Sequence, residues 1–207
     1  PQTIVLLSAA LEKFGTMPDF GAISSFSPIK PLLLFRFFKK NRWRKSIYFP
    51  CWGWGTTKKV WNKFRLQDYS SFSVQSLENS STWNKLTVNS REVWAGRFKK
   101  EFTPNPRTWD IQFQHMLFQN NLMTIIPQMS LSGNIGFDDS KASNTKASKP
   151  FWVASELYTF ETMDYRLTSP PLSYFLNLFD RNTFAHDTKL MQIKLFLQKA
   201  ITSTRKI

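Results

Sequence analysis

The chain has 207 residues with 28 Lys and Arg against 14 Asp and Glu, so its formal net charge is +14 at pH 7 and its pI is near 10.0. Because 42% of the residues are hydrophobic and 20 are Phe, the chain can form a sizeable core, which excludes an intrinsically disordered protein. A single cysteine excludes an internal disulfide or a cysteine zinc cluster. The longest uncharged stretch, residues 111–137, contains Gln, Asn and Pro throughout, which excludes a membrane helix there.

The first half of the chain predicts two helices and a strand. Apolar residues spaced by three and four positions over residues 3–14 predict a short amphipathic helix that ends at Gly15. The small apolar segment 20–26 predicts a buried strand, and the two elements together form half of an αβ unit. Residues 28–50 are both cationic and aromatic and are interpreted as a loop, and residues 57–66 are predicted to be a helix.

The second half predicts two helices, a strand and a terminal helix. The Ser-rich segment 70–81 is predicted to be a loop, after which Asn89 resembles the N-cap of a helix with an apolar stripe through Phe102. Thr108 is expected to cap the next helix, which continues to residue 120, and residues 122–126 are expected to form a strand before a proline. Residues 138–149 are polar and aperiodic, as in a loop, and Asp187 is expected to cap a last amphipathic helix.

Two ordered segments resemble a known family. The first is residues 48–61, which contain Trp52-Gly53-Trp54, and the second runs from Trp109-Asp110 through a strand ending in Pro127 to Asn134-Ile135-Gly136-Phe137. The pair resembles bacterial-type nucleotide-diphospho-sugar glycosyltransferases, in which a Trp-Gly-Trp stretch precedes a Trp-Asp helix, a strand ending in Pro and an Asn-Ile-Gly-Phe motif. The likeness covers roughly residues 5–150.

The resemblance implies an A-type glycosyltransferase fold, which is a Rossmann-like α/β domain around a mixed, mostly parallel sheet. Residues 1–150 are expected to be its C-terminal, acceptor-binding half, and residues 151–207 an extension that ends in an amphipathic helix and packs on the same domain. The nucleotide-binding half, with an acidic metal motif, would precede Pro1. This chain alone is therefore expected to be inactive.

The paired tryptophans are the candidate acceptor-binding residues. Sugars present apolar C–H faces that stack on aromatic rings, and Gly53 between Trp52 and Trp54 lets the backbone approach a ligand closely. The alternative is that each Trp packs in the core, as large aromatic residues often do. The Trp residues on helical stripes are interpreted as core residues: Trp61, Trp94 and Trp109.

Asp110 is the candidate catalytic residue. Inverting sugar transfer needs a carboxylate that accepts the proton of the acceptor hydroxyl, and the resemblance puts an acidic residue at the start of this helix. The alternative is that Asp110 only complements the helix dipole. Two residues of the adjoining loop, Asp138 and Asp139, are the next candidates for the base.

The donor diphosphate is expected to lie against the loop that follows the Asn-Ile-Gly-Phe motif. Backbone N–H groups and lysines there could hold phosphate oxygens, and the candidates are Asn134, Gly136, Lys141 and Lys146. The family has a Thr-His near Ser143-Asn144, and this chain lacks that His, which removes a metal-ligating imidazole. No residue of this chain is assigned as a metal ligand, and Mn²⁺ or Mg²⁺ is expected to bind through the preceding half.

The two histidines and the cysteine are assigned no chemistry. Neither His115 nor His186 has a partner at metal-ligand spacing, so both are interpreted as structural or surface residues. Cys51 is interpreted as a small buried hydrophobe.

The basic segment Arg36 to Lys45 supports a rival interpretation. Cations interleaved with aromatic residues are typical of single-stranded nucleic-acid grooves and of surfaces that bind anionic lipid. The alternative, which the sequence supports at least as well, is a solvated basic loop without a ligand. No nucleic-acid motif accompanies the segment, which disfavours a nucleic-acid partner. The sequence therefore predicts a cytoplasmic glycosyltransferase, peripheral on the inner face of the membrane, that transfers sugar from a nucleotide-diphosphate donor to a glycan or lipid-linked acceptor in polysaccharide assembly. The alternative is a non-catalytic basic module that binds nucleic acid or an anionic membrane surface.

Overall fold

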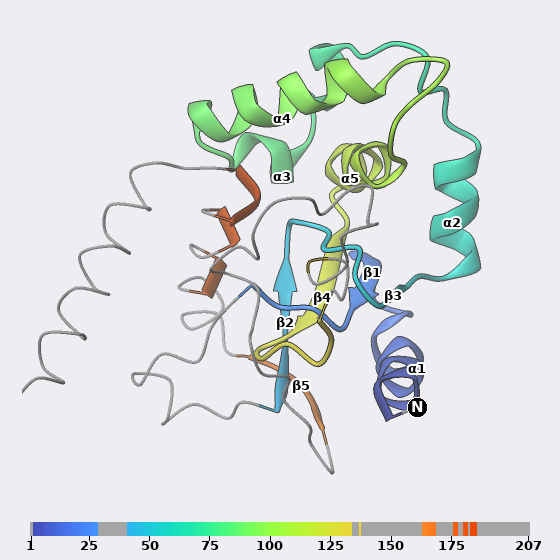
Figure 1. Cartoon of the computed structure of the whole chain (residues 1–207), viewed down its shortest axis with the longest axis vertical. Coiled ribbons are helices and arrows are strands. Elements are labelled where there is room, and N and C mark those ends of the chain that lie inside the picture. The colour runs from blue at the N-terminus through green and yellow to red at the C-terminus, as the bar shows by residue number, and fades with distance from the viewer. Residues whose placement is uncertain are drawn as a thin grey trace, which may run out of the picture.

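The computed structural model describes residues 2–28, 41–133, 137, 163–168, 176–177, 180–181 and 183–185. A five-stranded sheet with strand order β3-β1-β4-β2-β5 lies at its centre (Figure 1). Two pairings are parallel (β1 with β4, β2 with β5) and two are antiparallel (β1 with β3, β2 with β4). The expected α/β class with a mixed sheet is confirmed. The strands are β1 (Phe20–Ser24), β2 (Arg42–Ser46), β3 (Trp54–Gly55), β4 (Met123–Pro127) and β5 (Asp164–Leu167).

Besides the helical residues 137, 176–177, 180–181 and 183–185, five α-helices and a 3₁₀ turn lie beside the sheet in the described part of the chain. They are α1 (Gln2–Phe14), α2 (Lys58–Arg65), the 3₁₀ turn η2 (Val74–Leu77), α3 (Ser81–Asn84), α4 (Val88–Glu101) and α5 (Asp110–Gln119). In Figure 1, α3, α4 and α5 lie at the top and α1 at the lower right. Helix α5 contacts α2, α3 and α4 and packs on β1, so it connects these helices to the sheet, whereas α1 contacts β1 and β3 directly.

Both faces of the sheet are buried. Neighbouring residues of a strand point to opposite faces. In β1, Ile23 packs in one cluster with Phe14 of α1 and Trp43 of β2. Ala22 packs in a second cluster with Phe113 of α5 on the other face. A third cluster joins α3, α4 and α5 and includes Tyr48, Trp83, Trp94, Phe98 and Phe118.

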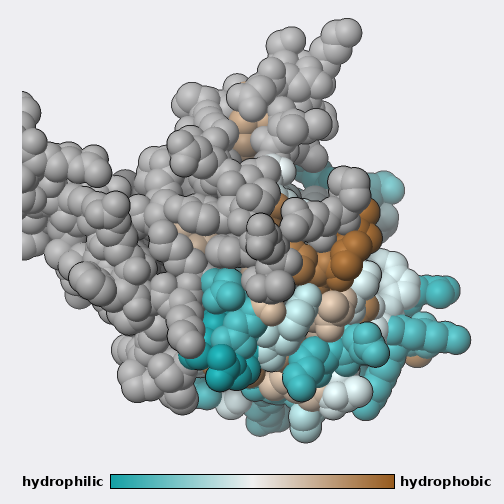
Figure 2. Space-filling view, turned by 90° about the horizontal axis from the view of Figure 1, so that it is seen from below, coloured by the Kyte–Doolittle hydropathy of each residue, from teal (hydrophilic) through white to brown (hydrophobic). Residues whose placement is uncertain are grey.

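Helix α1 leaves part of its apolar surface in solvent. Ile4 and Val5 are both exposed on α1, whereas Ala10 and Phe14 are buried. Figure 2, which is seen from below, shows hydrophobic residues gathered on this side of the molecule. No helix among the described residues is long and apolar enough to cross a membrane.

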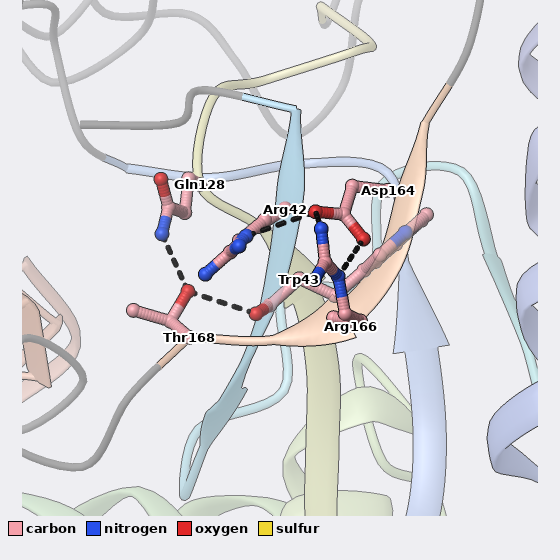
Figure 3. A network of polar contacts seen from close by, with 6 residues as sticks. All are labelled: Arg42, Trp43, Gln128, Asp164, Arg166 and Thr168. Atoms are coloured by element: carbon pink, nitrogen blue, oxygen red, sulfur yellow. Dashed lines mark hydrogen bonds and ion pairs between the residues drawn. The ribbon is translucent and has the colours of Figure 1, made fainter.

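Strand β2 lies within the segment that the sequence predicted to be a loop, so that prediction is wrong for residues 42–46. The physical reason is that its cations are paired by acidic residues far away in the sequence. Figure 3 shows Asp164 of β5 between Arg42 of β2 and Arg166. Asp164 accepts hydrogen bonds from Arg42 Nε at 3.0 Å and from Arg166 Nε at 2.7 Å. These hydrogen bonds, that of Arg166 first, lower the pKa of Asp164 to about 2.

The same view shows how β5 is fixed at the edge of the sheet. The backbone N–H of Thr168 donates to the carbonyl oxygen of Trp43 at 2.7 Å, and its hydroxyl donates to the same oxygen at 2.9 Å (Figure 3). The side-chain amide of Gln128, just after β4, donates to the Thr168 hydroxyl. The segments that follow β4 and β5 are therefore hydrogen-bonded to each other, and Thr168 also joins them to β2.

Arg44 of β2 forms a buried ion pair. Its Nη1 and Nη2 donate to the two carboxylate oxygens of Asp180 at 2.6 and 2.7 Å, and both side chains are fully buried. Ser46 Oγ donates to the same carboxylate at 2.7 Å, and Asn177 Oδ1 accepts from Arg44 at 3.1 Å. A cation that looks like part of a solvated basic loop in the sequence is thus a core residue.

Two helix starts differ from those predicted. The hydroxyl of Thr87, not the side chain of Asn89, caps α4 by accepting from the backbone N–H of Ser90 at 3.2 Å. Thr108 does not cap α5, because its hydroxyl donates to the Asp110 carboxylate instead. The segment predicted to be a Ser-rich loop contains η2. The expected loop at 138–149 and the last helix from Asp187 lie outside the described residues.

The buried ion pair gives the first prediction. Arg44→Met leaves the Asp180 carboxylate buried without its cation, so we expect a loss of about 3–5 kcal/mol in the free energy of unfolding, measured in urea. Arg166→Met removes an exposed cation from Asp164 and serves as the matched control, with an expected loss below about 1 kcal/mol. Equal losses in the two variants would contradict a structural role for the Arg44 pair.

Candidate functional site

Polar side chains gather at one edge of the sheet, where β1 and β4 both end. Because these strands are parallel neighbours, their carboxyl ends lie at the same edge. In open α/β sheets, ligands bind in the crevice outside the carboxyl ends of the strands. The polar residues at this edge, called here the serine edge, are Ser24, Ser25 and Ser27 from β1 and its extension and Gln128, Ser130 and Ser132 after β4.

Hydrogen bonds hold the two halves of the serine edge together. Ser25 Oγ donates to Ser132 Oγ at 2.7 Å, and the carbonyl oxygen of Ser25 accepts from the backbone N–H of Leu131 at 2.8 Å. The backbone N–H of Ser27 donates to Ser130 Oγ at 3.3 Å. The segments after β1 and β4 are thus fixed to each other rather than free loops.

The loop of residues 51–53 closes on this edge. The carbonyl oxygen of Trp52 accepts from Ser24 Oγ at 3.1 Å and lies 3.3 Å from Ser25 Oγ. The carbonyl oxygen of Gly53 accepts from the backbone N–H of Ser25 at 2.7 Å. Gly53 has a φ of 56°, and a Cβ at this position would lie 2.3 Å from Ser25 Oγ. Only glycine fits both the conformation and the space.

The two predicted acceptor-binding residues, Trp52 and Trp54, pack against different groups of side chains. The half-buried ring of Trp52 packs edge-on against Phe26, with 4.5 Å between centroids, and lies 5.8 Å from Phe137. Trp54 packs instead with the rings of Phe49 at 5.2 Å and Trp109 at 5.0 Å. Trp52 therefore belongs to the serine edge, whereas Trp54 belongs to the aromatic cluster beside α2 and α5.

Asp110 lies next to the 51–53 loop. It is the first residue of α5, and its carboxylate accepts from the hydroxyl of Thr108 and from the thiol of Cys51 at 3.7 Å. Burial first, and then the charge and hydrogen bond of Asp110, raises the pKa of Cys51 to about 12. At neutral pH Cys51 is thus a thiol that donates to Asp110, and it has none of the thiolate character of a nucleophile.

The predicted diphosphate-binding residues cannot be related to this geometry, because Asn134, Gly136, Lys141 and Lys146 lie outside the described residues. The same holds for Asp138 and for Asp139, and for the Ser143-Asn144 position. Across the part of the chain that is described, no three His, Cys, Asp or Glu side chains gather in a way that could hold a metal ion.

His115 occupies a structural position. Its ring is buried on α5, its Nε2 hydrogen-bonds with Ser76 Oγ at 2.9 Å, and Phe98 and Phe102 pack on it. Burial lowers the pKa of His115 to about 4, so the imidazole is neutral at pH 7. His186 lies outside the described residues.

The described part of the basic segment is neutralised within the fold. Besides the pairs of Arg42 and Arg44, Lys45 Nζ forms an ion pair with Asp19. Residues 36–40 of the segment lie outside the described residues.

Sequence reasoning missed the serine edge. Its signal is present in the chain, because serines recur directly after two apolar segments that both become parallel strands. Recognising it requires knowing that these two strands are neighbours, which the periodicity of neither segment gives.

Comparison of the chain with family models, with curated proteins and with solved structures finds no match. The fold and the site therefore define a class only: an α/β protein with a polar edge at the carboxyl ends of two parallel strands, an aromatic loop closed on that edge and a carboxylate beside the loop.

The glycines of the loop give the second prediction. Gly53→Ala places a side chain at positive φ and against Ser25, so we expect a loss of about 1–3 kcal/mol in the free energy of unfolding. Gly55→Ala is the matched control, because a Cβ at residue 55 meets only Ile23 Cγ2 at an ordinary contact distance of 3.6 Å. The free energy of unfolding of this variant should not fall. Thermal or urea unfolding of both variants measures the difference, and similar stabilities would contradict the loop geometry.

Proposed function

We propose that this chain is the acceptor-binding part of a glycosyltransferase that transfers a sugar from a nucleotide-diphosphate donor to a glycan or lipid-linked acceptor. The observation that carries the proposal is the placement of Asp110: its carboxylate is held by Thr108 and Cys51 beside the loop that closes on the serine edge. An aromatic ring and hydroxyl groups at the carboxyl edge of a sheet can bind a sugar, and a carboxylate beside them can accept a proton from its hydroxyl group.

In the proposed reaction Asp110 acts as the general base. It accepts the proton of an acceptor hydroxyl while that oxygen bonds to the anomeric carbon of the donor sugar. The bond from the anomeric carbon to the diphosphate breaks, and the nucleoside diphosphate leaves with the electron pair. Thr108 and Cys51 orient the carboxylate, which is a requirement for efficient proton transfer.

The order of motifs along the chain supports the same proposal. The Trp-Gly-Trp loop, the Trp-Asp helix start and the strand ending in Pro127 become the loop before α2, the start of α5 and β4, and all three meet near Ser25 or Asp110. Binding of the nucleotide-sugar and of a divalent cation remains a prediction, because the residues expected to bind them lie outside the described part of the chain. No step is assigned to a metal here, because the described residues gather no ligand set for one.

The rival function, a basic module for nucleic acid or an anionic membrane surface, has weaker support. Its main sequence signal is the segment from Arg36 to Lys45, and the three described cations at its end all pair with acidic residues of the fold. Peripheral association with the inner face of a membrane remains a prediction of the sequence.

Replacement of Asp110 tests the proposed chemistry. The full-length gene product is incubated with nucleotide sugars, glycan acceptors and Mn²⁺, and release of nucleoside diphosphate is followed. Asp110→Asn keeps the shape of the side chain and removes the proton acceptor, so we expect turnover to fall about 10²–10⁴-fold. The thermal midpoint should change little, because a first-turn carboxylate contributes about 1 kcal/mol or less.

Glu92→Gln on α4 is the control, because it removes an exposed helix carboxylate away from the site and should leave turnover unchanged. Near-normal turnover of Asp110→Asn with a lowered midpoint would show that Asp110 serves only the helix dipole. Absence of transfer from every donor by the unmodified protein would overturn the proposed function.

A further inference from the structure

Two tryptophans that the sequence assigned to the core are exposed. Trp61 of α2 and Trp109, just before α5, have exposed fractions of 36% and 38%. They are the exposed aromatic residues of the described part, where the other large exposed hydrophobic side chains are aliphatic: Ile4, Val5, Leu66, Val74 and Val88. The expectation that Trp61 and Trp109 are core residues is therefore wrong.

These two rings and Trp54 form one surface, called here the tryptophan face. The ring centroids of Trp61 and Trp109 are 6.5 Å apart at an interplanar angle of 80°, and Trp54 lies 6.2 Å from Trp61. Phe64 and Phe113 back the face, with Phe64 5.2 Å from Trp61 and Phe113 6.0 Å from Trp109. The rings are thus held in place before any ligand arrives, which lowers the entropic cost of binding.

The tryptophan face is flanked by exposed cations. Helix α2 has no acidic residue, and Lys58 and Arg65 lie three positions before and four positions after Trp61, on the same side of the helix. Within the described ranges neither of them forms an ion pair with an acidic side chain. The nearby Asp68 carboxylate accepts instead from Ser70. This contrasts with β2, whose cations are all paired.

We propose that the tryptophan face and the α2 cations bind an anionic glycan, a chain of sugar rings with carboxylate groups. The face of an indole ring attracts the positively polarised C–H groups of a sugar, and the flanking cations pair with its carboxylates. The inference rests on the proposed function. Trp109 of the tryptophan face directly precedes Asp110, so the anionic glycan is the acceptor on which the Asp110 carboxylate would act.

The ring geometry favours a glycan over single-stranded nucleic acid. Successive bases need roughly parallel aromatic platforms on which to stack. Trp61 and Trp109 are instead nearly perpendicular, so they present one ring face and one ring edge. This arrangement suits a bulky, non-planar sugar ring better than a pair of stacked bases.

Direct binding tests the proposal. Hyaluronan oligosaccharides are titrated into the 207-residue chain by calorimetry and by tryptophan fluorescence, without any nucleotide sugar. Neutral maltooligosaccharides of equal length and single-stranded oligo-dT are the comparison probes. We expect the acidic oligosaccharide to bind more tightly than the neutral one by about tenfold or more, with an affinity that falls as salt rises.

Surface variants locate the binding. Trp61→Ala and Lys58→Gln should each weaken hyaluronan binding by about tenfold. Lys58→Gln should leave the thermal midpoint unchanged because its side chain is exposed, whereas Trp61→Ala should lower it modestly because the ring packs on Phe64. Leu66→Ala removes an exposed apolar side chain at the end of the same helix, and Lys99→Gln an exposed cation on α4. Both controls should bind normally.

Absence of hyaluronan binding, or equal affinity for the neutral chain, would overturn the anionic-glycan assignment. Equal or tighter binding of oligo-dT with the same dependence on Trp61 would overturn it in favour of a nucleic-acid surface. The binding experiment contains no nucleotide sugar, so it does not depend on transfer activity. If the protein binds hyaluronan but transfers no sugar, only the proposed function is contradicted. Transfer without binding would count against this inference alone.

Discussion

Ser25 is the residue on which the candidate site depends. Its N–H donates to the Gly53 carbonyl, its own carbonyl accepts from Leu131, and its hydroxyl reaches both Trp52 and Ser132. One buried residue at the end of β1 therefore fixes the loop before β3 and the segment after β4 at the same time. This arrangement is possible only because residue 53 has no Cβ, and it places Cys51 where its thiol meets Asp110. The carboxylate and the serine edge are thus parts of a single constrained unit.

The net charge of +14 has two different roles in this fold. In β2, Arg42, Arg44 and Lys45 pair with acidic residues and stabilise the sheet or its attachment to distant segments. On α2, by contrast, the cations point to solvent beside exposed aromatic rings. Among the described residues, the exposed cations of α2 therefore lie outside the run of cations from Arg36 to Lys45, whose described members Arg42, Arg44 and Lys45 are all paired.

The elements that the sequence predicts well are those whose signal is local. Helices α1 and α2 lie within a residue or two of the predicted bounds, because their apolar spacing sets the buried face. Strand β2 could not be predicted in this way, since Asp180, which neutralises Arg44, comes 136 positions later in the chain. The start of α4 was missed by two residues because Thr87 and Asn89 are both competent caps, and the tertiary structure selects the first.

In the candidate site, too, the features with a local sequence signal could be predicted and those set by long-range contacts could not. Trp52, Gly53 and Asp110 could be singled out by residue type and order, and the structure brings them into one region. The contact that requires Gly53 is with Ser25, however, which only the pairing of β1 with its neighbours reveals. The exposure of Trp61 and Trp109 could not be predicted either, because a helical stripe of aromatic residues has the same pattern whether or not another element covers its edge.

The most direct test of this account is to locate a bound glycan by NMR. An isotope-labelled chain is titrated with a hyaluronan oligosaccharide, and the backbone amide shifts of the described residues are followed. We predict saturable changes at Trp61 and Trp109 of the tryptophan face together with Gly53 and Asp110, and none along the solvent side of α4. Changes confined to α4, or saturable changes that leave Gly53 and Asp110 unaffected, would contradict the claim that the acceptor binds at the carboxyl edge of the sheet.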